Sequence, residues 1–347
     1  MLPRICRAPR ASFRSQVRSY ATVESPVIVA KPPLPPPTPE RTEFSTLNNI
    51  VLNALAHEPS GSRTSLPQLI QQYLERSGHV LNSHLSYEPQ PSDARRPNLD
   101  VTQTGDRGVH LIAHCVQEGD RHKVSLSSGF ALNATGEREG ESVIIRWSPL
   151  LVLPNSHSTP PLAAPDLPGA RSSGTVILSG SPNKDPVVHP VTAVLSSLHR
   201  SDLLLLSKAG PSVPSLPVSP YPAQPGTAIR AHFFSDVRPQ GQEGEGWEPW
   251  IGGSWAKWVR GTVLGYRDFA GREAQPGTYD SLSHLLFKPP PTAGSSGGPI
   301  IDEETGAVVG IMLGTRMDNR VEGTRGWGVP AETIFEMFSL PGLKLKR

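Results

Sequence analysis

The chain has 347 residues, of which 18% are charged and 36% hydrophobic, and it carries 38 prolines and 32 glycines. So many prolines and glycines argue against a helical bundle and predict short strands joined by turns. The sequence holds no apolar run near the roughly 20 residues that a membrane helix needs, so we expect no membrane span.

The first 20 residues predict a targeting segment. Residues 1–20 hold five arginines and no acidic residue. An Arg-rich, Ser-containing start without acids, able to form an amphipathic helix, is the mitochondrial transit pattern, and a disordered basic tail is the alternative. The stretch from Arg18 to Thr22 also resembles a matrix processing site, with cleavage after Tyr20. We therefore expect a presequence over 1–20 and a mitochondrial location, in the matrix.

Charge and cysteine content agree with that expectation. The chain has 33 basic and 31 acidic residues, and removing the five arginines of residues 1–20 leaves 28 against 31. The basic balance comes from this segment, so it does not predict a nucleic-acid partner. Of the two cysteines, Cys6 lies in the same segment and Cys115 then has no intrachain disulfide partner, which fits a reducing compartment.

A linker and a helical arm come next. The proline-rich residues 21–43 predict an extended linker. Residues 44–98 predict a helical arm followed by a polar link, because apolar residues recur at helical spacing over 43–58 and again over 65–78. The strand-rich remainder, residues 99–347, is expected to form a single further domain.

Short β-rich runs separated by turn residues fill the rest of the chain. Runs of this kind without long helices between them predict a sandwich or a barrel. A terminal helix is expected over 330–340. The predicted strands cover residues 108–116, 122–133, 141–147, 174–180, 191–195, 201–207, 227–235, 259–266, 282–287, 298–314 and 326–330.

One Gly/Ser loop stands out among many. Residues 294–299 read Gly-Ser-Ser-Gly-Gly-Pro and precede an apolar strand, a polar turn and a second apolar strand. Glycines permit a tight turn that aims backbone amides at one point, which is what an oxyanion requires. A serine in such a loop becomes a nucleophile when a base takes its proton.

This loop and the strands after it resemble the second barrel of trypsin-like serine proteases, in the HtrA-like branch without disulfides. The resemblance spans residues 122–340 and is most specific over 294–340, where the loop, a hairpin and the stretch GWGVP lead into a final helix. It implies an all-β fold of two packed six-stranded antiparallel barrels, after a short N-terminal helical arm. The boundary between the barrels is expected near 210–225.

The resemblance also implies roles for residues of this loop and of the strand after it. Ser296 is the expected nucleophile, and the amides of Gly294 and Ser296 form the oxyanion hole. The strand residues expected to bind substrate are Leu313, Gly314 and Thr315. Pro290, six residues before Ser296, stands where a trypsin-like pocket has its acid. A small or apolar substrate side chain is therefore expected, polypeptides are the expected substrates, and no cofactor or metal is expected.

The rest of the triad is harder to place. In the family the order is His, Asp, Ser with gaps of about 45 and 93 residues. Asp202 lies 94 residues before Ser296 and starts an apolar strand, so it is the expected orienting acid, with a surface Asp as the alternative. The histidine is expected near 145–149, where this chain has none. His157, 45 residues before Asp202, is the nearest candidate, and His114 is interpreted as a strand residue.

Several alternatives stay open at this stage. His189 or His199 is a weaker candidate for the base. Alternatively, the chain has no competent histidine. It is then either a catalytically impaired protein of the same fold that binds peptides, or a sequence from which a short segment between Ile145 and Arg146 has been lost. A stretch rich in Trp and cations over 246–269 can stack on single-stranded nucleic acid, but packing of these tryptophans on the barrel or the helical arm is preferred. The oligomeric state is not predicted.

Overall fold

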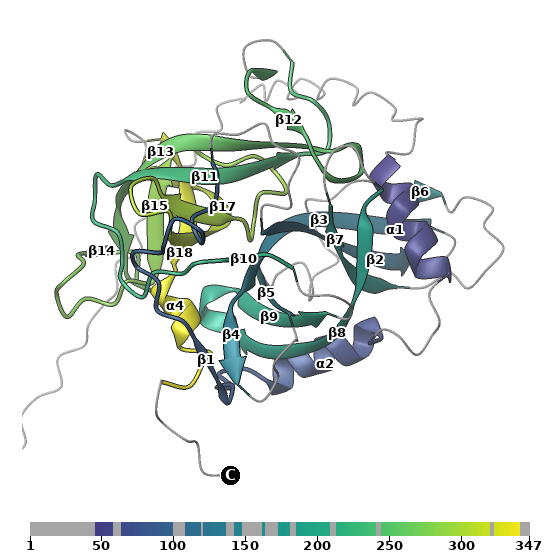
Figure 1. Ribbon diagram of the computed structural model, residues 1–347, viewed down its shortest axis with the longest axis horizontal. Helices are drawn as coiled ribbons and strands as arrows, with labels where there is room; N and C mark the ends of the chain where they lie inside the picture. The colour runs from purple at the N-terminus through teal and green to yellow at the C-terminus, as the bar shows by residue number, and fades with distance from the viewer. Residues whose placement is uncertain are drawn as a thin grey trace, which may run out of the picture. The chain divides into compact units, whose positions relative to one another are not determined.

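The structure is a computed structural model (Figure 1). It describes residues 46–57, 64–99, 108–118, 121–136, 142–147, 162–163, 173–180, 185–208, 213–240, 244–319 and 323–340. The proposed presequence, the linker and His157 lie outside the described residues. No helix in the described part is long and apolar enough to cross a membrane.

The first barrel is a closed ring of antiparallel strands. Its strands follow the order β3-β2-β7-β8-β9-β5, and β5 pairs back onto β3 to close the ring. Two short strands, β6 (Leu162–Ala163) and β10 (Ser215–Leu216), attach to β3. The six strands are β2 (Val109–Glu118), β3 (Arg121–Leu132), β5 (Ser142–Trp147), β7 (Gly174–Ser179), β8 (Val187–Leu198) and β9 (Leu203–Lys208).

The second barrel closes in the same way, in the order β11-β16-β17-β18-β15-β13, with β13 pairing back onto β11. The short strands β12 (Glu248–Pro249) and β14 (Glu273–Ala274) attach to β13. The six strands are β11 (Ala228–Ser235), β13 (Trp255–Arg267), β15 (His284–Lys288), β16 (Pro299–Asp302), β17 (Val308–Asn319) and β18 (Gly323–Pro330). Two six-stranded antiparallel barrels confirm the predicted fold class.

A shared apolar core joins the barrels. One cluster of buried side chains includes Phe130 and Leu178 from the first barrel and Ile311 and Val329 from the second. Apolar burial of this kind stabilises a fold by about 25 cal/mol per Å² removed from water. The two barrels are therefore fixed against each other by the same contacts that stabilise each of them.

The helical arm packs on the barrels. Helix α1 (Thr46–His57) buries Leu47, Val51, Leu52 and Leu55. Helix α2 (Leu66–Glu75) begins with a capping box between Ser65 and Gln68. It lies against β8, where Gln72 Oε1 accepts from the amide of Val194 at 2.8 Å and the Arg76 guanidinium donates to its carbonyl at 2.7 Å. Val194 borders an irregularity in the β8–β9 register, so α2 satisfies backbone groups that the sheet leaves open.

Three of the four tryptophans of residues 246–269 are buried and the fourth, Trp255, is partly buried against the same core, so they pack on the protein as preferred from the sequence. Trp250 and Trp258 are buried in the core cluster that includes α1, and Trp247 is buried in a core cluster of the second barrel. The turn η3 (Ile251–Gly253) contacts α1 directly.

The terminal helix is shorter than the predicted range 330–340, which is a correction. Helix α4 covers Glu332–Phe335, and the backbone then continues through i to i+3 hydrogen bonds such as Phe338 N to Phe335 O. The reason is pairing with the arm: Leu81 donates to the Met337 carbonyl, and Ser339 donates to the Leu81 carbonyl. The adjoining strand β1 (Ser83–Leu85) pairs with β4 (Ala134–Gly136). Non-local pairing therefore overrides the helical pattern of the segment.

The buried His110 predicts a pH dependence of stability. His110 on β2 is fully buried, and neither ring nitrogen forms a hydrogen bond within the described part of the chain. Burial, followed by the positive fields of His189 and Lys208, lowers its pKa to about 3. The unfolded chain takes up this proton first, so the free energy of unfolding falls by up to ~1.4 kcal/mol per pH unit as pH drops below about 6.5. We expect His110→Leu to flatten this slope in urea unfolding at pH 7 and 5; an unchanged slope contradicts the assignment.

Candidate active site

The loop between β15 and β16 is a tight turn built on two glycines. Gly294 and Gly297 both lie at φ +86°, a left-handed conformation that favours glycine. Inside the turn, Ser295 donates to the Thr292 carbonyl at 3.2 Å and Gly298 donates to the Ser295 carbonyl at 2.9 Å. The alternation of Gly and Ser in the sequence therefore corresponds to a defined conformation.

The two serines of the loop have different environments. Ser295 is fully buried, and its hydroxyl oxygen accepts from the Phe234 amide at 2.9 Å and contacts the Thr292 hydroxyl at 2.9 Å. Those bonds anchor the loop on β11. Ser296 is partly exposed, and its hydroxyl is free of these anchoring contacts. Of the pair, Ser296 is the serine available for chemistry.

The first barrel holds the same loop from the other side. The amide of Ser128, on β3, donates to the Ser296 carbonyl at 2.9 Å. Its hydroxyl donates to the Gly294 carbonyl at 3.2 Å. The loop carrying Ser296 thus lies where the two barrels meet.

Two backbone amides remain available at the turn. In the part of the chain that the structure describes, the amides of Gly294 and Ser296 donate to no acceptor, although their carbonyls are both bonded to Ser128. Backbone amides that have no acceptor and lie within one turn can stabilise the negative charge that develops on a substrate oxygen in the transition state. These are the two amides that the sequence predicted for the oxyanion hole.

Strand β17 runs past the loop and leaves an open edge. Gly297 donates to the Met312 carbonyl at 2.7 Å, and Met312 donates to the Gly298 carbonyl at 2.9 Å. The Ser296 hydroxyl then donates to the Leu313 carbonyl at 2.8 Å. Beyond Ile311, β17 pairs with β18 alone among the described strands. An extended peptide can add to such an edge through main-chain hydrogen bonds.

Asp202 lies on the first barrel at the start of β9. It ends the turn η1 (His199–Ser201) in a left-handed conformation, φ 53°, which Asp tolerates better than most residues. Burial raises the pKa of its carboxyl group, and His199 partly offsets this. The carboxylate accepts no hydrogen bond within the described part of the protein. A half-buried carboxylate of this kind is a suitable acceptor for an imidazole N–H.

The end of β5 lies between the two parts of the site. Trp147 pairs with Leu203, the residue after Asp202, and Arg146 pairs with Gly129, the residue after Ser128. The chain leaving β5 therefore starts between Asp202 and the support of Ser296. This is where the family resemblance placed the histidine that the sequence lacks.

The three described histidines that the sequence brought into question, His114, His189 and His199, have other partners. The ring of His114 contacts the Thr175 hydroxyl at 2.9 Å on β7, as expected of a strand residue. His189 contacts the Ser179 hydroxyl at 2.8 Å. His199 contacts the Tyr73 carbonyl at 3.1 Å and stacks on the Tyr73 ring. None of the histidines in the described ranges bonds to Ser296, and His157 lies outside them.

Three of the four residues expected to bind substrate lie on β17, and the fourth, Pro290, does not. Leu313 is nearly buried, whereas Gly314 and Thr315 are more exposed at the open edge. Pro290 is exposed in the segment between β15 and the Ser296 loop. The sequence did not predict the role of Ser128, although Ser128 lies in the predicted strand over 122–133.

Two closed six-stranded barrels that meet at a Gly-Ser-Ser-Gly-Gly loop define the double-barrel fold of trypsin-like serine proteases. The chain belongs to the family of trypsin-like peptidase domains, whose model matches residues 112–311, more than half of the sequence. This match shows a peptidase domain, for which polypeptides are the substrates.

The chain is also similar to several solved structures. The chain is 17% identical to the protein Rv3671c from M. tuberculosis H37Rv in an inactive form, with 65% of this chain and 82% of that chain covered and a TM-score of 0.35. It is 14% identical to the HtrA-type protease AlgW with a tripeptide, covering 66% and 58%, at a TM-score of 0.39. For the MamO protease domain from Magnetospirillum magneticum the identity is 14%, the coverage 67% and 97%, and the TM-score 0.39. No curated protein matches the chain.

Gly294 offers a test of the loop geometry. A Cβ at this position would clash with the Phe234 ring, in addition to the left-handed φ. Gly271 has a similar φ of +80° but open space around it. We expect Gly294→Ala to cost about 1–3 kcal/mol more in the free energy of unfolding than Gly271→Ala, measured by urea denaturation. Equal costs in the two variants mean that the contact with Phe234 does not constrain the loop.

Proposed function

We propose that the protein is a serine endopeptidase that cleaves polypeptides through an acyl-enzyme on Ser296. The observation that carries this proposal is the turn at 294–298, in which a partly exposed serine stands beside two unused backbone amides. Ser295 and Ser128 hold that turn from both barrels. Fixed donors of this kind stabilise the transition state because they need no reorganisation during the reaction.

The open edge of β17 suggests how substrate binds. The Leu313 carbonyl now accepts a hydrogen bond from the Ser296 hydroxyl. A substrate amide that donates to the same carbonyl would replace this hydroxyl as the donor. Substrate binding would thus release the hydroxyl as it aligns the scissile carbonyl. Ser296 Oγ then attacks the carbonyl carbon, its proton passes to the base, and the amides of Gly294 and Ser296 hold the oxyanion. The base returns the proton to the leaving amine, and water hydrolyses the ester.

His157 is the proposed base and Asp202 its orienting acid. The test is the rate at which a fluorophosphonate probe labels the full chain. His157→Ala is expected to reduce labelling to the background of Ser296→Ala, because serine, base and acid act as a unit. His57→Ala is the control, since His57 is exposed on α1 and bonds to the Asn53 carbonyl. Undiminished labelling of His157→Ala removes His157 from the mechanism.

A second candidate is a catalytically impaired protein of this fold that captures extended peptides on β17. It is favoured by the hydrogen bond from Ser296 to Leu313, which occupies the hydroxyl, and by the absence of a histidine bonded to Ser296 among the described residues. Under this proposal the folded full chain binds peptide and remains unlabelled by the fluorophosphonate.

We further propose that the protein acts in the mitochondrial matrix, in protein quality control. The support is the acid-free segment with five arginines at residues 1–20, and the quality-control role rests on analogy of fold alone. Import of the full chain into isolated mitochondria, followed by N-terminal sequencing, tests the location. A mature protein starting at Ala21 is expected, and a chain that stays outside and uncut contradicts it.

A further inference from the structure

A row of aromatic and cationic side chains crosses the second barrel from Arg316 on β17 over β18 and β15 to the loop after β13. The Arg316 guanidinium lies 4.3 Å from the ring centroid of Trp327, on β18. The Trp327 ring lies 4.4 Å from that of His284, on β15, and His284 lies 6.1 Å from Phe269. At the far end, Arg200 of η1 lies 5.9 Å from the Phe269 ring. Contacts of this kind hold the side chains in one arrangement.

The register of β17 and β18 places this row near the proposed site. Gly314 pairs with Trp327 and Thr315 pairs with Gly326. Arg316 is therefore three residues beyond Leu313, whose carbonyl contacts Ser296. Three residues of extended chain span about 10 Å. A peptide lying along this edge would bring a side chain two to four residues from the scissile bond next to Arg316.

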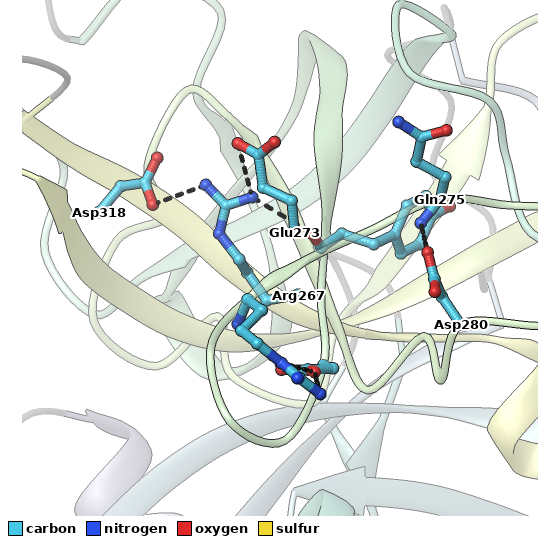
Figure 2. Close-up of polar contacts among 8 residues, drawn as sticks. Arg267, Glu273, Gln275, Asp280 and Asp318 are labelled. Carbon is cyan, nitrogen blue, oxygen red and sulfur yellow. Dashed lines mark hydrogen bonds and ion pairs between the residues drawn. The ribbon is translucent and has the colours of Figure 1, made fainter.

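The charge of Arg316 is not neutralised locally. Arg316 is exposed and pairs across the strands with Arg325, and like charges directly opposite each other are unfavourable. Among the described residues Arg316 forms no ion pair. Its neighbour Arg267 differs, because Asp318 lies 3.2 Å and Glu273 3.5 Å from its guanidinium (Figure 2). Arg316 is therefore a cation beside the open edge of β17, and no carboxylate among the described residues forms an ion pair with it.

The loop that carries Phe269 is held in place by its own polar contacts. Asp268 accepts from the Arg272 amide at 2.9 Å and from its guanidinium at 2.7 Å. Further along, the amide of Gln275 donates to Asp280 at 3.0 Å (Figure 2). Phe269 is nevertheless 53% exposed. A fixed loop that presents an exposed aromatic ring is a feature of binding surfaces.

We propose that Arg316 and the row Trp327, His284 and Phe269 form a subsite for an acidic side chain of the polypeptide substrate, two to four residues from the scissile bond. This inference rests on the proposed function, because it takes β17 as the substrate strand. Arg316 supplies the charge and is oriented by Trp327, and the aromatic rings supply apolar contact for the stem of a glutamate. Burial, with Arg316 as the second cause, lowers the pKa of His284, so the row holds a neutral imidazole near neutral pH.

The test measures binding rather than cleavage. Fluorescein-labelled decapeptides of Ala, Val and Gly, carrying one Glu or one Gln moved along the sequence, are titrated with the full chain bearing Ser296→Ala, and anisotropy is recorded. We expect the best Glu peptide to bind about 3- to 10-fold more tightly than its Gln counterpart, with the preference weakening in high salt. Arg316→Gln is expected to remove the preference.

The control is a second exposed arginine that lies against a tryptophan ring, away from Arg316. Arg238 is exposed and lies 5.0 Å from the ring of Trp255, so Arg238→Gln is expected to keep the Glu preference. Equal binding of Glu and Gln peptides at every position, or a preference that survives Arg316→Gln, overturns the subsite. A preference in a chain without hydrolytic activity contradicts only the proposed catalysis. Hydrolysis without an acidic preference contradicts only the subsite.

Discussion

Replacing Ser296 by alanine is expected to lower the rate of polypeptide hydrolysis by about 10⁴-fold or more, to the level of the remaining binding and oxyanion contacts. The folded structure is expected to persist, because the hydroxyl makes one hydrogen bond, to the Leu313 carbonyl. The measurement is turnover of a quenched fluorescent polypeptide, with circular dichroism to confirm folding.

Ser295→Ala is the matched control for this experiment. Ser295 is the neighbouring serine, but its hydroxyl anchors the loop to Phe234 and Thr292. Its loss leaves the buried Phe234 amide without an acceptor, at a cost of about 1–3 kcal/mol in the free energy of unfolding. The folded variant is expected to retain turnover. Retained turnover in Ser296→Ala, or its complete loss in folded Ser295→Ala alone, contradicts the assignment of the nucleophile.

Replacing Asp202 by asparagine is expected to change activity and stability in opposite directions. The exchange keeps the shape and suits the left-handed φ of 53°. Without the carboxylate the base is held in the wrong tautomer, so hydrolysis is expected to fall by roughly 10²- to 10⁴-fold. Stability at pH 7 is expected to rise, because burial raises the pKa of Asp202 and the folded state therefore disfavours the charged form.

The change in stability caused by Asp202→Asn is expected to depend on pH. The stability gain of Asp202→Asn is expected at neutral pH, where Asp202 is ionised, and to shrink as pH falls and the carboxyl group becomes protonated in both states. Thermal unfolding at pH 7 and pH 4 measures the difference. Unchanged hydrolysis in the folded variant removes Asp202 from the mechanism, whatever its effect on stability.

The loop at 294–298 was predictable because its chemistry is local. Glycines at positions of positive φ, and a serine between them, are visible in a short stretch of sequence. The barrel strands were predictable for a similar reason, since alternation and turn residues act over a few positions.

The support of that loop was not predictable. The Ser128 hydroxyl contacts the Gly294 carbonyl across 166 positions of sequence, and no local pattern encodes such a contact. The terminal helix was overestimated for the same reason, because Ser339 pairs with Leu81 instead of continuing the helix. Long-range backbone pairing decides such elements against their local propensity.

The catalytic base was difficult to predict from the sequence for a different reason. Spacing alone led to His157, and spacing together with the apolar strand that follows it led to Asp202, whereas the strand register puts the end of β5 between Asp202 and Ser128. Asp202 is a half-buried carboxylate at the start of β9, and its role as the orienting acid stays a prediction, as does the role of His157, which lies outside the described residues. Spacing measures distance along the chain, and a triad depends on distance in space.

The proposed mechanism requires Ser296 to be an activated nucleophile. Peptide mapping by mass spectrometry of the full chain, after treatment with a fluorophosphonate, tests it most directly. We expect one phosphonyl adduct, on the peptide carrying Ser296 and absent from Ser296→Ala. A folded chain that takes up no adduct, or takes it up at Ser295, contradicts the claim.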